Sequence, residues 1–337
     1  MRYLLLLASC AAFLIGCTNF GGRHEVKMRV VDETGVPVAG AAVEVLFVNS
    51  SGSDVREGRS GSDGTYAASG RGSDSVMLRA EKVGYYPAQV EGLSKDMNHD
   101  VEVVLPRILN PVALFAWDTQ MGNAVRFPVQ GEWIGFDFEA ADWVAPHGKG
   151  KTTDILFRFR NEFKGWDDDL RYPEDMEKAV KFSKEMYQAA RMEWTMDKFR
   201  VDYGKWDGVM EISFPGEKEG LVETTKFLSY SRFKMPHSAP LEGYVPSWRY
   251  ENRSYRSWSD REDKGFFLRT RVKLDKQGKI ISANYAKVRG DFRLDAKHSC
   301  VGFSYYFNPN ANDRNLEFDL KKKLFPAELP GADVRHP

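Results

Sequence analysis

Short stretches of alternating apolar and polar residues, separated by glycine-rich turns, recur through the first third of this 337-residue chain. Residues 26–30 place an apolar side chain at every second position, as a strand with one buried face does. Similar strand patterns return in three further segments, at residues 43–47, 76–80 and 101–105. The polar segment 49–61 is interpreted as a solvated loop. Strands at this spacing, without helical periodicity, predict a small antiparallel β-sandwich over residues 25–107.

Three motifs in this segment occur in a recognisable order: VKMRVVDETGVPVAGAAVEVLF from Val26, SDGTY from Ser62 and LRAEKVGYYP from Leu78. Together they resemble the carboxypeptidase regulatory-like domain, which is a transthyretin-like β-sandwich. The resemblance implies a fold and a spacer or interaction role. It does not imply peptidase chemistry, because the metal ligands and the acid of a carboxypeptidase belong to a separate catalytic domain.

Residues 107–110, between Pro106 and Pro111, form a short linker, and beyond it all eight tryptophans of the chain are found. Residues 112–330 are predicted to form a larger β-rich (α+β) domain, followed by a tail at 331–337. Its predicted strands lie at 134–138, 153–159, 209–214, 266–274, 280–286 and 301–307. Parts of this region resemble a family of uncharacterised bacterial lipoproteins, which implies the pairing of domains and no activity.

One main amphipathic helix is expected after Pro173, which suits the first turn of a helix. Glu174 and Asp175 would favour its positive end. Six residues would share its apolar face, which we expect to pack on a sheet: Met176, Ala179, Val180, Ser183, Tyr187 and Ala190. The overall fold class is therefore mostly β, with one decorating helix.

The run Leu14-Ile15-Gly16-Cys17 ends a short apolar stretch that begins after Arg2. This stretch is too short to span a bilayer and fits the core of a signal peptide. The run resembles the lipobox of bacterial lipoproteins. That resemblance implies a signal peptide at residues 1–16, a lipid on Cys17, a tether at 17–24 and attachment to the cell envelope. The residue after the cysteine is Thr18 rather than Asp, and for this reason the resemblance also implies retention in the outer membrane.

The amino-acid composition argues against several kinds of partner and cofactor. Lysine plus arginine and aspartate plus glutamate both number 48, and without a net basic field nucleic acid is not expected as a partner. After Cys10 leaves with the signal peptide and Cys17 carries lipid, Cys300 alone remains, so no internal disulfide is expected. Cys300 lies in an apolar strand-like run and is interpreted as a buried small hydrophobic residue. No two histidines share metal-ligand spacing, and we expect no metal, cofactor or catalytic motif.

The glycine-rich stretch at residues 142–151 is the first choice of ligand platform. Trp143 could stack on a sugar ring, while His147, Lys149 and Lys151 could add polar contacts. The alternative is that Trp143 is a buried anchor for a tight turn.

Three other segments contain candidate functional residues. The oxygen-rich run from Asn308 to Asp319 could hold calcium, or could be a turn held by its own Asn and Asp side chains. Asp137 and Glu139 lie at period two on a strand and could act as acid and base. The basic and aromatic residues of 248–271 could bind a ligand, or could form a salt-bridged loop or strand edge.

These observations favour a lipid-anchored cell-envelope protein with a non-catalytic binding or structural role. Its expected ligand is a carbohydrate or another envelope protein. The alternative is a hydrolase that acts on polysaccharide through carboxylates of the second domain. Two carboxyl groups about 5–10 Å apart in an aromatic cleft would favour the hydrolase.

Overall fold

The computed structural model describes residues 22–49, 52–72, 75–93, 98–119, 124–167, 170–172, 174–224, 226–252 and 264–337. Cys17 and the signal peptide lie outside this range. The chain divides into two compact units, Met1–Arg107 and Ile108–Pro337, and the division falls in the expected linker. No helix in the described part of the chain has the length and apolar character needed to cross a membrane.

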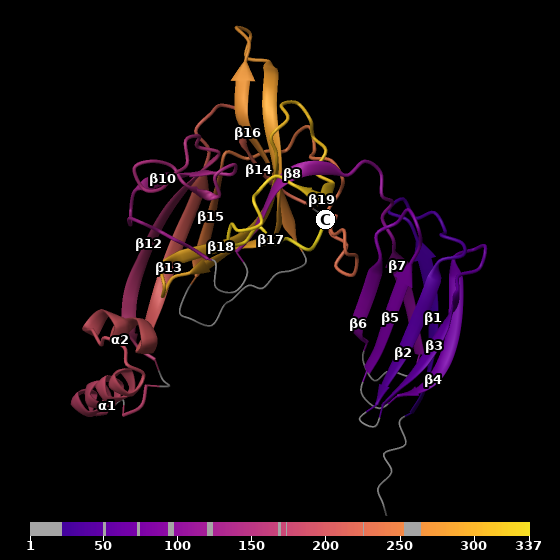
Figure 1. Cartoon of the computed structure of the whole chain (residues 1–337), viewed down its shortest axis with the longest axis horizontal. Helices are drawn as coiled ribbons and strands as arrows, with labels where there is room; N and C mark the ends of the chain where they lie inside the picture. Colours follow the sequence, from indigo (N-terminus) through magenta and orange to yellow (C-terminus); the bar gives the residue numbers. More distant parts are fainter. Residues whose placement is uncertain are drawn as a thin grey trace, which may run out of the picture. The chain divides into compact units, whose positions relative to one another are not determined.

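The first unit is a β-sandwich of two sheets (Figure 1). The three-stranded sheet has the order β4 (Thr65–Gly72), β1 (Gly22–Val31), β7 (Asn98–Val104). The four-stranded sheet has the order β3 (Gly52–Arg59), β2 (Ala42–Asn49), β5 (Ser75–Glu81), β6 (Ala88–Leu93). Alternate residues of both sheets meet in one apolar core, which includes Val26, Met28, Val45, Phe47 and Leu78.

Two details of this unit differ from the sequence prediction. The polar segment 49–61 is mostly strand β3, which pairs with β2 along its whole length. Since β3 lies at the edge of its sheet and is largely exposed, it carries no apolar alternation that could reveal a strand. In addition, β1 and β7 pair in parallel, so the sandwich is not entirely antiparallel.

The second unit is built on two larger sheets. The five-stranded sheet has the order β11 (Asp142–Trp143), β10 (Trp133–Asp137), β12 (Ile155–Trp166), β13 (Gly204–Ser213), β15 (Ser247–Asn252). The other has the order β14 (Gly220–Glu223), β16 (Gly265–Leu274), β17 (Ile280–Asp295), β18 (Cys300–Asn308), β8 (Val112–Asp118), β19 (Phe318–Lys323), and β9 (Val125–Arg126) pairs with β18. Both sheets contribute to one aromatic core, which includes Phe136, Phe157, Phe266, Phe303 and Tyr305. The mostly β fold class is confirmed.

The larger sheet is buried on its other face as well. A second apolar cluster there includes Leu114, Phe267 and Tyr306, and residues of 226–246 and of the C-terminal segment pack on it. The segment 331–337 therefore is not a free tail: Ala332 and Val334 are buried. Burial on both faces explains why β18 is a continuous apolar run rather than an alternating one.

Two helices lie beyond one end of β12 and β13 (Figure 1). The expected helix is α1 (Met176–Ala189), which starts later than predicted because the Asp175 side chain caps it by accepting from the backbone N–H of Lys178. The second helix, α2 (Met196–Tyr203), was not predicted; Thr195 caps it in the same way. Instead of covering a sheet, the helices share a small core around Leu170, Ala179 and Phe199.

Lys287 is a buried cation between the larger sheet and the segment 226–246 that packs on it. Its side chain is fully enclosed, and its Nζ lies 4.6 Å from the ring centroids of both Phe233 and Tyr306. Burial lowers the pKa of Lys287 to about 7, assisted by the positive charge of Arg289 and opposed by Glu317. The unfolded chain keeps an ordinary lysine pKa, so between about pH 7 and 10 it binds a proton that the folded chain has released. This group therefore makes folding less favourable at neutral pH than at alkaline pH.

Lys287→Met should raise the stability of the second unit, and the gain should be larger at pH 6.5 than at pH 9.5. Methionine keeps the unbranched apolar stem and removes the charge that must be desolvated. Urea unfolding followed by tryptophan fluorescence reports this unit alone, since every tryptophan lies after residue 110. An equal change at both pH values would contradict the assignment of the cost to the lysine charge.

Candidate functional site

Trp143 is a core residue in this structure. Its side chain is 4% exposed, and its indole N–H donates to the carbonyl of Arg126 at 2.9 Å. The ring packs against Phe127, Phe136 and Phe157, with centroid distances of 5.5–5.8 Å. The expectation that Trp143 stacks on a ligand is therefore corrected, because the ring has no free face to offer.

The rest of the Trp143 loop is folded back over the core by two carboxylates. Asp142 accepts from the backbone N–H groups of Trp143 and Lys149, and Asp137 accepts from those of Lys151 and Thr152. His147, Lys149 and Lys151 are exposed around it. The structure thus separates these three polar side chains from the indole with which they were expected to act.

Asp137 and Glu139 do not form an open acid–base pair. Asp137 is buried and also accepts from the N–H of Glu139, while Glu139 forms an ion pair with Arg271. The guanidinium of Arg271 also donates to both carboxylate oxygens of Asp154, at 2.7 and 2.9 Å. These carboxylates are held by backbone N–H groups and one guanidinium, so the arrangement is a structural crosslink rather than a catalytic pair.

The Asn308 run is a turn held by its own side chains. Asn308 is fully buried and donates to Asp313 at 3.0 Å and to the carbonyl of Asn315 at 2.8 Å. Asp313 and Asn315 accept in turn from backbone N–H groups two residues along. Among the described residues, no group of three or more His, Cys, Asp or Glu side chains is arranged to hold a metal ion.

Two further sequence interpretations can be placed. Two parts of the basic–aromatic stretch are described. Residues 248–252 belong to β15, the edge strand of the five-stranded sheet, where Arg249 pairs with Glu211 and Glu251. Residues 264–271 lie at the start of β16, where Lys264 pairs with Asp291 at 3.0 Å. Residues 253–263 lie outside the described range. Cys300 is half-buried, and burial raises the pKa of its thiol to about 11, which disfavours the reactive thiolate.

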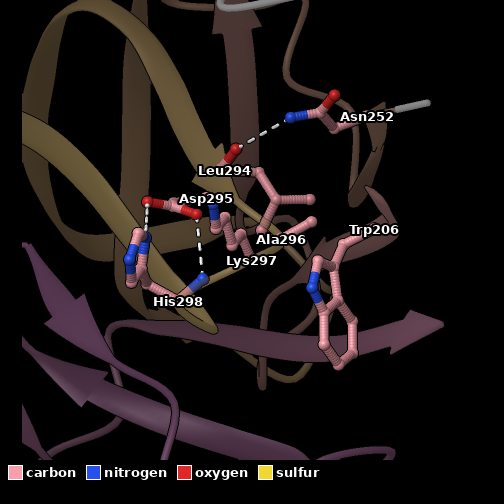
Figure 2. A pocket seen from close by; sticks show the side chains of 7 residues that line it. All are labelled: Trp206, Asn252, Leu294, Asp295, Ala296, Lys297 and His298. Carbon is pink, nitrogen blue, oxygen red and sulfur yellow. Dashed lines mark hydrogen bonds and ion pairs between the residues drawn. The ribbon is translucent and has the colours of Figure 1, made fainter. Parts of the chain in front are cut away.

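A pocket of about 240 Å³ lies where the two sheets of the second unit meet at the end of β17. It is lined by Trp206, Asn252, Leu294, Asp295, Ala296, Lys297 and His298. Figure 2 shows Trp206 on one side and the Asp295–His298 pair on the other, with Leu294 and Ala296 between them. Trp206 is half-buried, so in contrast to Trp143 part of its surface is open.

The polar groups of the pocket are held in place by hydrogen bonds. Asp295 accepts from the backbone N–H of His298 at 2.9 Å and lies 2.7 Å from its Nδ1, which orients the ring. Asn252 donates to the carbonyl of Leu294 at 3.2 Å, and Lys297 donates to the carbonyl of Asp202 at 2.7 Å. An oriented imidazole, an amide and an ammonium thus surround an apolar floor.

A glycine allows the two sheets to approach at this floor. A Cβ on Gly208 of β13 would lie 2.5 Å from the Cβ of Ala296 and 3.2 Å from Cδ2 of Leu294. From the neighbouring strand β12, Asn161 donates to the carbonyl of Ala296 at 2.7 Å and to the hydroxyl of Ser299 at 3.2 Å. The turn between β17 and β18 is therefore fixed to the opposite sheet.

Sequence reasoning missed this pocket because its residues come from three separate segments. The local signals were Trp206 between Gly204 and Gly208, and His298 three residues after Asp295. Neither signal shows that the two segments meet.

No family model matches the sequence, and a search of curated proteins finds no match. Among solved structures, the chain is similar to 3-chlorocatechol 1,2-dioxygenase from Rhodococcus opacus, with 8% identity over 27% of this chain and 62% of that one and a TM-score of 0.23. It is also similar to a minor pilin from Streptococcus agalactiae, with 18% identity, 28% and 48% coverage and a TM-score of 0.22. A third is a proposed carbohydrate-binding protein from Bacteroides uniformis, with 6% identity, 86% and 98% coverage and a TM-score of 0.20. This chain spans less than two thirds of the first two proteins, and matches at this level assign neither a family nor an activity.

Trp143→Ala should destabilise the second unit by about 3–5 kcal/mol, the usual cost of removing a buried large aromatic side chain. Lys149→Ala in the same loop is the control and should change stability by less than about 0.5 kcal/mol, because its side chain is exposed. Urea unfolding measures both. A Trp143→Ala protein as stable as the wild type would show that the indole is not part of the core.

Proposed function

We propose that the chain is a lipid-anchored protein of the bacterial cell envelope whose second unit binds one sugar ring in the Trp206 pocket. The observation that carries the proposal is that one pocket combines the half-open indole of Trp206, a histidine oriented by Asp295, an amide and the apolar side chains of Leu294 and Ala296. A sugar ring has apolar C–H faces that pack on an indole and hydroxyl groups that need hydrogen-bond partners. The pocket supplies both kinds of contact.

The size of the pocket supports a small ligand. Pockets that enclose drug-sized molecules measure about 300–1,000 Å³. A volume of about 240 Å³ suits one ring or the terminal residue of a longer chain.

Binding is better supported than hydrolysis through paired carboxylates. A glycosidase places two carboxyl groups about 5–10 Å apart beside the scissile bond. The residues that line the pocket include one carboxylate, Asp295, which is engaged with His298. We therefore propose a non-catalytic binding role.

The lipid anchor and the role of the first unit are also proposals. Support for the anchor comes from the lipobox-like run that ends at Cys17, and Thr18 favours the outer membrane. The first unit would be a carboxypeptidase regulatory-like spacer. Its sandwich core and its three motifs support this assignment.

Trp206→Ala should weaken saccharide binding at least about threefold, because ring stacking contributes about 0.5–1.5 kcal/mol beyond area burial and 1.4 kcal/mol is a factor of ten. Trp206→Phe keeps a ring and should retain most of the affinity. The matched control is Trp133→Ala, which removes an exposed indole from the same sheet. A glycan array with the purified full chain, followed by titration of the best ligand, measures these effects. A wild-type protein that binds no glycan, or equal affinities for Trp206→Ala and wild type, would refute the site.

Cys17→Ser should move the protein from the membrane fraction to the soluble fraction, because two or more acyl chains are needed for stable anchoring and the variant cannot receive the first. Fractionation with a carbonate wash, followed by immunoblotting, measures the shift, and Cys300→Ser is the control. Persistence of Cys17→Ser in washed membranes would show that lipid is not the anchor.

A further inference from the structure

Helix α2 ends directly beside the pocket, and its last carbonyl groups have no partners within the helix, as at any helix C-terminus. Three of them are satisfied from outside. The carbonyl of Tyr203 accepts from the backbone N–H of Asp167 at 2.8 Å. The other two accept from side chains that line the pocket.

These two bonds join the helix to the pocket wall. The indole N–H of Trp206 donates to the carbonyl of Arg200 at 3.1 Å, and the ammonium of Lys297 donates to the carbonyl of Asp202 at 2.7 Å. The positive charge of Lys297 also suits the negative end of a helix. Trp206 and Lys297 therefore each shape the pocket and cap α2.

Gly204 makes this close contact possible. A Cβ at this position would lie 2.3 Å from the carbonyl oxygen of Arg200 and 2.9 Å from Nε1 of Trp206. Any larger residue would push the indole away from the helix end. Glycine at position 204 is thus needed for Trp206 to cap α2.

Apart from these bonds, the helices are held by a hydrogen bond from Tyr187 to Asp202 at 2.6 Å and by a small core. Their shared core contains three fully buried residues, Leu170, Ala179 and Phe199, with partly buried neighbours such as Trp166. Most residues of α1 are exposed or half-buried. An element with few buried contacts opens locally more easily than the well-packed sheets of the same unit do.

We propose that the pocket and the α1–α2 pair form one cooperative unit, in which the pocket is complete only while α2 is docked. Undocking of α2 would release Trp206 and Lys297 together. A ligand that requires both side chains in place would bind the docked state alone and stabilise it by mass action. The identity of that ligand as a sugar rests on the proposed function, whereas the mutual dependence of pocket and helices does not.

Hydrogen–deuterium exchange of the full chain, without ligand, tests this dependence in both directions. Lys297→Met and Trp206→Phe each remove one cap and keep an apolar side chain, and each should speed exchange in residues 176–203 by about fivefold, the effect of one lost hydrogen bond. Lys82→Met is the matched control, because Lys82 donates to the carbonyl of Ala39 at 2.8 Å in the first unit. It should leave residues 176–203 unchanged.

The reverse perturbation starts at the far end of α2. Thr195→Ala removes the side chain that accepts from the N–H of Lys198, and it should speed exchange in residues 294–298 although it touches none of them. Unchanged exchange at 294–298 in Thr195→Ala, or at 176–203 in both cap variants, would overturn the proposal. Failure to find a saccharide for the wild type would instead refute the proposed function, and the exchange result would still decide the coupling.

Discussion

The bidentate pair between Arg271 and Asp154 is the constraint on which the second unit depends most. Arg271 belongs to β16 of the larger sheet, and Asp154 directly precedes β12 of the smaller one, so the pair joins the two sheets across their core. Burial raises the pKa of Asp154, and the guanidinium opposes that shift. Removing one partner of such a pair typically costs about 3–5 kcal/mol, since the remaining charge stays buried and unpaired. The two sheets are therefore fixed to each other by a contact that tolerates little displacement.

The pair also organises its surroundings. Thr270 donates to Asp154 at 3.1 Å, and the guanidinium lies 4.7 Å from the ring of Phe307. Arg271 has a positive φ of 52°, which few residues other than glycine adopt readily, and the register of β16 and β17 shifts at this point. The bulge turns the guanidinium toward the carboxylates of the other sheet. Asp137, which lies 3.6 Å from the guanidinium of Arg271, also accepts from the backbone N–H groups of Lys151 and Thr152 in the Trp143 loop. That loop is therefore joined to the crosslink rather than being a free binding surface.

Sequence patterns predicted strands with a clear apolar alternation or a continuous apolar run, and missed the exposed edge strand β3. Strand β2 alternates buried and half-buried residues along its length, and its period was visible in the sequence. Strand β3 has no buried residue, because it is an edge strand. The contrast between Trp143 and Trp206 could not be read from the sequence either. Both tryptophans lie in short glycine-containing segments. Trp143 is enclosed because Phe127 and Phe157, from other segments, pack on its ring, and its local sequence does not show these contacts.

Many acidic residues of the second unit have a structural role, so their number in the sequence was a poor guide to catalysis. Glu219 accepts from the backbone N–H groups of Gly216 and Val272, and Glu317 accepts from those of Leu109 and Asn110. Asp137 serves the Trp143 loop in the same manner. Each of these carboxylates satisfies backbone donors that would otherwise be costly to bury. Asp295 at the pocket also accepts from a backbone N–H, that of His298, and in addition it holds the His298 imidazole, which lines the pocket. The polar chemistry available to a ligand is therefore concentrated where a turn of one sheet, a strand of the other and the end of α2 converge.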